Sequence, residues 1–455
     1  MDGFLFDKGS QERPTPEEVA AEGRARVGKP RLRLPQRNQA EMHWASLEQM
    51  LEPDHQARVV WAAVCRLNLG RWLAEIKAVE GGVGRDATDP RLLVALWVYA
   101  TLDGVGSARE LARLCEKHLA YQWLCGGVTV NYHLLADFRS QGGDKWDELL
   151  TQIVGALMAE KLVTVHRVAQ DGMRVRANAG SSSYRRRSRL EECLEEAREQ
   201  VEALKQQADE SPEEVARRQQ AARARAAAER QQRLEEAIRQ CEELQQKREE
   251  TAKKSGRKAE EPRASSTDPE SRKMKFADGG TRPGYNVQFA TDTASDVIVG
   301  RDVTNVGSDQ SELPPMLDQI HERTGRTPEE GLVDGGFASL EAIDQAAQRG
   351  CTVYAPLKDE HKQLRTGKDP YAPKKGDSEA VAAWRRRMGT AVAKAVYRWR
   401  CQTAEWVNAL CRNRGLWQMP VRGLAKCRIV ATIYAIAHNV MQGARLRAEA
   451  AMNGP

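Results

Sequence analysis

Three acidic residues occupy positions where carboxylates commonly take part in chemistry. Asp171 lies within an apolar, β-branched run at residues 162–175, and Asp334 ends a second apolar run, Gly331–Asp334. In an α/β sheet, functional groups gather at strand ends and in the loops just beyond them. Glu405 stands instead in an arginine-rich helical stretch, where an ion pair is the favoured interpretation if the residue is considered alone. Together the three could converge on Mg²⁺, because hard divalent cations prefer oxygen ligands.

The chemistry open to such a carboxylate group is phosphodiester displacement. Two metal ions roughly 4 Å apart can hold both the attacking and the leaving oxygen of an in-line reaction. Gly172 and Gly335 directly follow the two Asp residues, which predicts that a phosphate or an ion can approach the backbone there. Each Asp-Gly pair taken singly is also ordinary turn chemistry.

The elements that must position these residues alternate between strands and helices. The predicted order is strand (163–175), strand (285–291), strand (296–303), helix (313–323), strand (331–334), helix (339–348) and strand (352–357). This order predicts an α/β unit with a mixed sheet. Helices at 378–388, 390–412 and 427–445 follow, and the second of these carries Glu405.

A highly charged segment, residues 184–262, interrupts this unit. Apolar residues recur there at spacings of four and three, which is typical of a heptad seam. Asp209–Pro212 breaks the first helix, so two antiparallel helices are expected. The segment could be a coiled-coil scaffold, but its place between strands favours an insertion into a catalytic domain. The seam positions are Leu190, Leu194, Ala197, Val201, Leu204 and Ala208, followed by Leu234, Ile238, Cys241 and Leu244 in the second helix.

Residues 41–161 are helical in pattern. Ser107, with Glu110 three residues later, predicts a capped helix, and a further helix follows near Tyr132–Arg139. Short helices joined by a tight turn are typical of a helix-turn-helix, although many helical domains contain such a pair without binding DNA. Residues 1–40 are predicted to form a flexible basic arm. This arm either contacts DNA phosphates or is a disordered tail without a specific role.

The composition excludes several classes of protein. The 455 residues include nine Cys, no two within four positions of each other, so no zinc-ribbon spacing exists and reduced thiols are expected. The apolar runs Leu92–Thr101 and Ile429–Ala437 fall short of the ~20 residues of a membrane helix. No apolar stretch near the N-terminus resembles a signal peptide, so a soluble, intracellular protein is expected.

Positive charge is concentrated in one part of the chain. The net charge is +6, but Lys358–Arg428 alone contains 17 Lys and Arg against 6 Asp and Glu. Such a stretch indicates a surface for a polyanion, most plausibly nucleic acid, or else a solvated arginine-rich helical face.

Taken together, the blocks around the three acids resemble a DDE transposase of bacterial insertion sequences. In the family's Tyr-Arg-Glu-Lys signature, three residues usually separate Arg and Glu, whereas four separate Arg400 from Glu405, and Arg412 stands where the signature has Lys. The matching segments are Val168-Ala169-Gln170-Asp171-Gly172, Thr267-Asp268-Pro269-Glu270-Ser271-Arg272, Arg282-Pro283-Gly284-Tyr285-Asn286-Val287-Gln288, Val333-Asp334-Gly335-Gly336-Phe337, and the signature residues Tyr397, Arg400, Glu405 and Arg412.

The resemblance implies a fold and a domain plan. It implies a ribonuclease-H-like mixed sheet with helices, interrupted by a long antiparallel helical hairpin and preceded by an all-helical N-terminal domain. The expected parts are the basic arm (1–40), the DNA-binding domain (41–161), the catalytic domain (162–183 and 263–445), the hairpin insertion (184–262) and a tail (446–455).

The resemblance also implies a mechanism. Activated water cuts a strand at the end of the element, and the freed 3′-hydroxyl then attacks target DNA, both by in-line phosphoryl transfer without a covalent protein intermediate. Asp171, Asp334 and Glu405 would be the catalytic metal ligands for Mg²⁺ or Mn²⁺, as two ions. Tyr397, Arg400 and Arg412 would contact DNA. Trp399 or Trp406 could stack on a displaced base, but core packing is favoured for both.

The implied partners are terminal inverted repeats and target DNA, with no membrane. A homodimer assembled on DNA and a cytoplasmic, nucleoid-associated location in a bacterium are expected. Two alternatives remain at this point: a metal-dependent nuclease without strand transfer, and a non-catalytic DNA-binding scaffold. The presence of all three acids, Asp171, Asp334 and Glu405, disfavours the scaffold.

Overall fold

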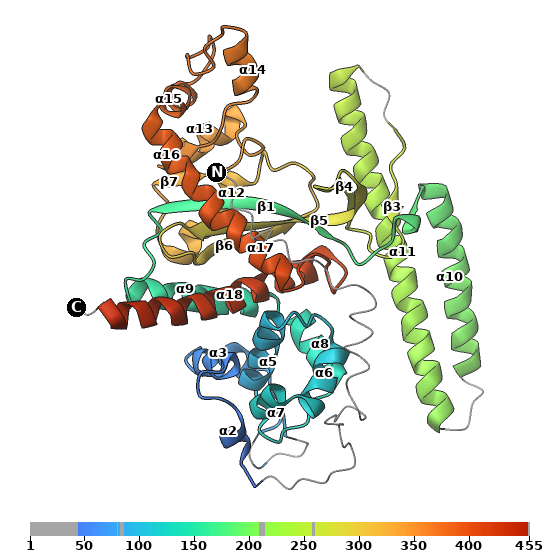
Figure 1. The fold of residues 1–455 in the computed structure, drawn as a ribbon. Coiled ribbons are helices and arrows are strands. Elements are labelled where there is room, and N and C mark those ends of the chain that lie inside the picture. The colour runs from blue at the N-terminus through green and yellow to red at the C-terminus, as the bar shows by residue number, and fades with distance from the viewer. Residues whose placement is uncertain (1–43, 80, 82–85, 209–213, 257–259, 454–455) are drawn as a thin grey trace, which may run out of the picture. The chain divides into compact units, whose positions relative to one another are not determined.

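The structure is a computed structural model that describes residues 44–79, 81, 86–208, 214–256 and 260–453 (Figure 1). The predicted basic arm, residues 1–40, and the predicted break at Asp209–Pro212 lie outside the described residues. The described chain combines a mixed sheet with many helices, which agrees with the ribonuclease-H-like expectation at the level of fold class.

A six-stranded sheet lies at the centre of the α/β unit. Its strands run in the order β4-β5-β1-β7-β8, and β6 pairs with β5. β5 is antiparallel to β1, β4 and β6, while β7 is parallel to both β1 and β8. The sheet is therefore mixed, as the sequence predicts. The strands are β1 (Arg167–Arg176), β4 (Arg272–Lys275), β5 (Thr281–Asp292), β6 (Ile298–Thr304), β7 (Glu330–Leu332) and β8 (Thr352–Tyr354), with a separate small pair formed by β2 (Tyr184–Arg185) and β3 (Ala264–Ser265).

The N-terminal helices share one hydrophobic core with the sheet. A single buried cluster contains Trp97 and Leu150 from these helices, Phe289 from β5 and Ile436 from the C-terminal helix α18 (Leu424–Asn453). The core thus continues across the predicted domain boundary at residue 161. The helices before that boundary are α2 (Leu47–Met50), α3 (Gln56–Val64), α4 (Gly70–Leu73), α5 (Pro90–Leu102), α6 (Ala108–Lys117), α7 (Leu119–Cys125), α8 (Tyr132–Gln141) and α9 (Gly143–Ala159).

Local sequence signals account for several helix starts. Ser107 accepts a hydrogen bond from the Glu110 backbone N–H and begins α6, as its capping pattern predicts. Ser339 caps α13 (Leu340–Gln348) in the same way. Asp89 caps α5, and Pro90 occupies its first turn, where a missing N–H costs nothing.

A second cluster covers the part of the sheet that carries β7 and β8. It contains Leu332 and Val353 from the strands, and Ile343 and Trp384 from the helices packed against them. The helices between β6 and α18 are α12 (Leu313–Thr324), α13, α14 (Glu360–Arg365), α15 (Glu379–Met388), α16 (Ala391–Arg400) and α17 (Trp406–Asn413).

The charged insertion contains two long helices, α10 (Arg187–Ala208) and α11 (Glu214–Ser255), that lie side by side in Figure 1. They share their own buried cluster, which includes Leu190, Leu194 and Leu234 from the predicted seam. Because β2 and β3, which flank the helices, pair with each other, the insertion leaves and re-enters the α/β unit at one place (Figure 1).

The final helix differs from its prediction. α18 runs from Leu424 to Asn453, past the expected end at Arg445, so the residues predicted as a tail are helical through Asn453. Within the extension, Arg447 forms an ion pair with Glu160 at the end of α9. None of the described helices is long and apolar enough to span a membrane.

Candidate active site

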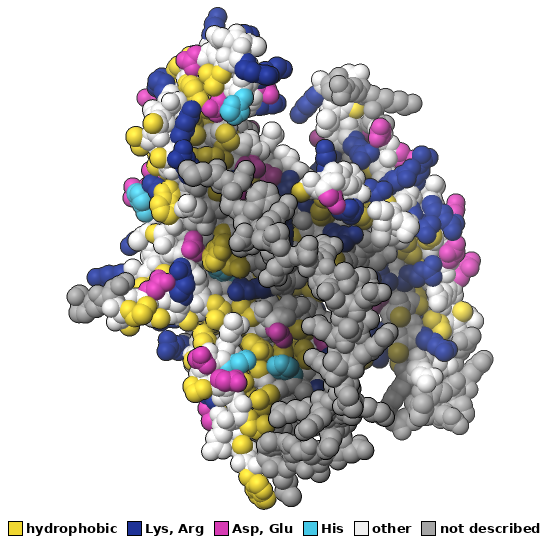
Figure 2. Space-filling view, in the orientation of Figure 1, with side chains coloured by type: hydrophobic (Ala, Val, Ile, Leu, Met, Phe, Trp, Pro, Cys, Tyr) yellow, Lys and Arg dark blue, Asp and Glu magenta, His cyan; other side chains and the backbone are white. Residues whose placement is uncertain are grey.

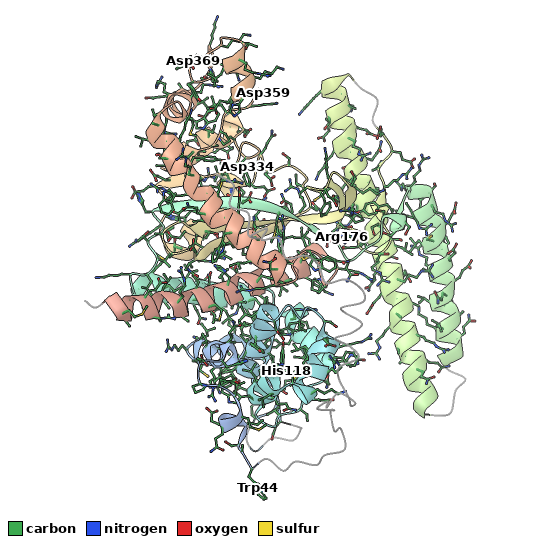
Figure 3. The ribbon with its side chains drawn as sticks, in the orientation of Figure 1. Trp44, His118, Arg176, Asp334, Asp359 and Asp369 are labelled. Carbon is green, nitrogen blue, oxygen red and sulfur yellow. The ribbon has the colours of Figure 1, made fainter. Side chains whose placement is uncertain are left out.

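The sheet register brings Asp171 and Asp334 to the same level on neighbouring strands. Ala169 of β1 pairs with Leu332 of β7 in parallel. Continuing that register by two residues places Asp334, just after β7, beside Asp171. In parallel neighbours, residues at the same level project to the same side, so the two carboxylates share one face. In Figure 3, Asp334 lies close to the β1 ribbon.

Glu405 arises from a helix with an irregular turn. The predicted helix 390–412 is continuous from Ala391 to Asn413, but its middle, Cys401–Glu405, is a π-helical turn between α16 and α17. A π-turn accommodates one extra residue in an α-helix and is common at functional sites. This turn explains the unusual spacing of the signature, because the extra residue between Arg400 and Glu405 lets both side chains remain on one face.

The three carboxylates converge on one guanidinium group. Arg400 Nη2 lies 2.8 Å from Asp171 Oδ1 and 4.0 Å from Asp334 Oδ2, and Arg400 Nη1 lies 2.8 Å from Glu405 Oε1. Residues 171, 334 and 405, far apart in the sequence, thus meet at a single cation. The sequence-based assignment of Arg400 to a DNA contact differs from this position, since the residue is only 7% exposed and bonds to carboxylates.

The depth of the three acids is unequal. The Asp171 side chain is largely buried, whereas Asp334 and Glu405 are each close to half exposed. Burial raises the pKa of Asp171, against the opposing effect of Arg400. Burial alone would lower the pKa of Arg400. The negative charges of the surrounding acids have the larger opposite effect, so the pKa of Arg400 is raised. The site is therefore anchored on Asp171 and opens to solvent at the other two acids.

Sequence reasoning missed Asn408, which also holds Asp171. Its Nδ2 donates to Asp171 Oδ2 at 2.9 Å, and its side chain is buried. Asn408 follows Glu405 by three residues at the start of α17, a spacing that places both on one helix face. The three-residue spacing between Glu405 and Asn408 was the feature of the sequence that could have identified Asn408 as a site residue. With Arg400 on Oδ1 and Asn408 on Oδ2, both oxygens of Asp171 are fixed in direction.

The prediction that Gly172 leaves room for a phosphate is wrong. A Cβ atom at this position would lie 2.7 Å from Asp309 Oδ1, because the side chains of Asp309 and Gln288 fill the space beside Gly172. The glycine is required by packing. At the second acid, the Gly336 N–H donates to Asp334 Oδ1 at 2.6 Å, so the backbone turn itself orients that carboxylate.

The remaining predicted residues lie around the site at different depths. Tyr397, on α16, is partly buried against the cluster that covers β7 and β8, and burial raises its pKa. Arg412 is exposed on α17. The preference for core packing of Trp399 and Trp406 is wrong, since their side chains are 48% and 40% exposed. The rings of Trp406 and of His438 on α18 lie 5.9 Å apart in a T-shaped arrangement.

The donor set has the chemistry that a hard divalent cation requires. Asp171, Asp334 and Glu405 contribute carboxylate oxygens that already surround one positive charge. Among the described residues, no three His, Cys, Asp or Glu side chains are placed to hold a metal ion directly. The guanidinium of Arg400 lies between the acids and keeps their carboxylates apart. These residues could hold a metal where Arg400 now compensates their charge.

The π-turn makes a testable prediction about the helix. Deleting the exposed residue Gln402 should convert the turn to regular α-helix and leave Glu405 and Asn408 facing Asp171. The catalytic activity of this variant should stay within about tenfold of the wild type, which corresponds to ~1.4 kcal/mol. Deleting the exposed Ala395, which lies in regular α-helix, should rotate all following helical residues by about 100° and abolish the activity. Equal loss in both deletions would contradict this role of the turn.

Comparison with protein families finds two matches. Residues 45–141 match the family described as Transposase domain (DUF772), and residues 238–440 match the family described as Transposase DDE domain. The second range includes Asp334, Arg400 and Glu405, and the two ranges together cover most of the chain. The comparisons find no match among curated proteins and none among solved structures. With both matched families being transposase families, this chain belongs to the DDE transposases of insertion sequences, enzymes that act on DNA and generally depend on divalent metal.

Proposed function

We propose that this transposase cuts and joins DNA at the site formed by Asp171, Asp334 and Glu405. The observation that carries the proposal is the convergence of these three carboxylates, from β1, from the turn after β7 and from the π-turn, on one guanidinium. The bound ions, Mg²⁺ or Mn²⁺ and two in number, would activate the attacking oxygen and stabilise the leaving oxygen.

The chain's own residues would bind and orient the reacting groups. Asp171, fixed by Asn408 and buried, would be the rigid ligand. Asp334 and Glu405 face solvent, so the scissile phosphodiester would approach from their side. In the first step a water oxygen attacks phosphorus, the strand breaks with departure of the 3′-oxygen, and the freed 3′-hydroxyl becomes the next nucleophile.

In the second step the 3′-hydroxyl oxygen would attack a phosphorus of the target strand. A new phosphodiester forms as the target's own 3′-oxygen leaves, so no bond to the protein is needed. The test is to supply a DNA end already cut to a 3′-hydroxyl, together with a target plasmid. Joined products with Mg²⁺ or Mn²⁺, and none with EDTA, are expected. Cleavage of an uncut end without any joining would favour the nuclease alternative.

Specific recognition would involve terminal inverted repeats, brought together by a homodimer on DNA. The basic stretch Lys358–Arg428 would contribute phosphate contacts at each end. On the face shown in Figure 2, Lys and Arg side chains also gather over the hairpin helices α10 and α11. The N-terminal helices would supply discrimination of sequence, although their core is continuous with the sheet, so point substitutions test this better than truncation.

Exposed Arg412 should contact a DNA phosphate. The variant Arg412→Ala should weaken binding to matched and scrambled end DNA alike, because phosphates carry no sequence information. The slope of log affinity against log salt should become shallower by about one. Binding is measured by fluorescence anisotropy at several salt concentrations. Arg349→Ala is the control, since Arg349 is already paired with Asp318. A selective loss on matched DNA would instead assign Arg412 to base recognition.

A further inference from the structure

A groove of about 670 Å³ lies between the N-terminal helices and the loop that follows α17. The first turn of α6 and the start of α8 form one wall, and residues 415–420 form the other. The second wall is attached to the end of β1, where the Arg176 N–H donates to the Trp417 carbonyl and the Met419 N–H donates to the Arg176 carbonyl. The groove is separate from the carboxylate site, which lies further back along β1.

The groove contains a buried cation without a carboxylate partner. Arg139 lines it and is only 7% exposed, yet forms no ion pair with any described acid. Its Nη1 donates to the Gly106 carbonyl at 2.7 Å, and its buried Nε has no hydrogen-bond partner among the described residues. Burial lowers the pKa of Arg139 to about 10, so it remains charged at neutral pH. The guanidinium lies 4.0 Å over the Trp97 ring, but a buried charge without an acidic partner is still costly, which favours an anionic ligand at this position.

The adjacent helix end adds to the preference for an anion. Ser107 and Arg109, from the N-terminus of α6, line the same groove as Arg139. A helix N-terminus presents backbone N–H groups and a partial positive charge, which together favour phosphate. None of the described residues that line the groove is acidic.

Two exposed aromatic rings face the groove, each with an arginine over it. Trp417 is 54% exposed, with the Arg176 guanidinium 5.8 Å from its ring centre. Tyr132 is 36% exposed, with Arg109 at 5.2 Å. Exposed rings among cations are typical of surfaces that bind single-stranded nucleic acid, because bases stack on the rings while the cations hold the backbone. Duplex DNA would engage the cations but has no free base faces for the rings.

We infer that this groove binds a single DNA strand that has left the duplex, with its phosphates at Arg139 and Arg176 and a base stacked on Trp417. The strand geometry connects the groove to the carboxylates. Arg176 follows Asp171 by five residues on β1, a distance of about 16 Å. A few nucleotides span that distance, because each advances about 3.4 Å even in a stacked duplex strand and advances further once the strand is unstacked. Figure 3 places Arg176 beyond Asp334, toward the hairpin. A single DNA strand could thus contact both the groove and the carboxylate site.

The experiment measures binding of the full chain to a 20-nucleotide oligothymidine and to a duplex of equal length, in EDTA. Trp417→Ala should weaken binding of the single strand by between about fivefold and a hundredfold, the usual effect of losing one stacked base. Trp417→Phe, which keeps a ring, should restore most of the affinity. Arg176→Ala should also weaken single-strand binding, and neither change should alter duplex binding as much.

The matched control is Arg326→Ala. Arg326 is exposed near the opposite end of β1, where it donates to the Thr164 carbonyl, so the comparison with Arg176→Ala holds residue type and exposure constant. If Trp417→Ala and Arg176→Ala weaken the single strand no more than Arg326→Ala, the inference is overturned. An equal loss on duplex and single strand also overturns it. Since EDTA removes metal and the three acids are untouched, the outcome is independent of the proposed catalytic site.

Discussion

Asp334→Asn should abolish both DNA cleavage and strand transfer while leaving the fold intact. The substitution removes one carboxylate charge from the group that faces Arg400. Loss of several kcal/mol of transition-state stabilisation corresponds to a rate decrease of about a thousandfold or more. The fold should persist because the asparagine Oδ1 can still accept the Gly336 N–H, and because the side chain is close to half exposed.

The measurement is cleavage of a labelled end and joining of a pre-cut end, with thermal unfolding recorded in parallel. Asp359→Asn is the matched control. Asp359 has a positive φ of 56°, a conformation that asparagine tolerates well, and in Figure 3 it lies away from Asp334 toward α14. The control should retain full activity. Undiminished cleavage by Asp334→Asn in Mg²⁺ would remove this residue from the catalytic site, as would equal losses in both variants.

Arg400→Met should destabilise the metal-free protein and strengthen its binding of Mn²⁺. The guanidinium now compensates Asp171 and Glu405 at 2.8 Å each. Removing one partner of a buried charge pair typically costs about 3 kcal/mol or more, because the other charge stays buried. A divalent ion can then neutralise the same oxygens without displacing the arginine. The rise in Tm on adding Mn²⁺ should consequently be larger for Arg400→Met than for the wild type.

Thermal unfolding with and without Mn²⁺, together with calorimetric titration, provides the readout without DNA or activity. Arg412→Met is the control, since Arg412 is exposed on the same helix and has no ion pair among the described residues. It should change neither the stability nor the metal response. A weaker Mn²⁺ response in Arg400→Met would mean that Arg400 supports the metal site instead of competing with the ion.

Local signals in the sequence determined much of the fold. The apolar, β-branched run at residues 163–175 predicted β1, and the strand pair predicted at 285–291 and 296–303 corresponds to β5 and β6, because such residues favour extended backbone. Ser107 and Ser339 predicted helix starts correctly because a cap depends on its immediate neighbours. The end of α18 was missed, although residues 446–453 consist mainly of strong helix formers (Leu, Arg, Ala, Glu and Met).

The sequence by itself also indicated the three acids, through motif blocks whose residue types suit metal-dependent phosphoryl transfer. Only the tertiary structure decided what surrounds them. The π-turn that accommodates the extra residue, the hydrogen bond from Asn408 to Asp171 and the burial of Arg400 among the carboxylates all depend on how α16 and α17 pack against β1. Gly172 was misread for the same reason, since the side chains that fill the space beside it come from another strand and a distant loop. Spacing along a chain specifies which residues share a face, but contacts between distant segments arise only when hydrophobic burial brings those faces together.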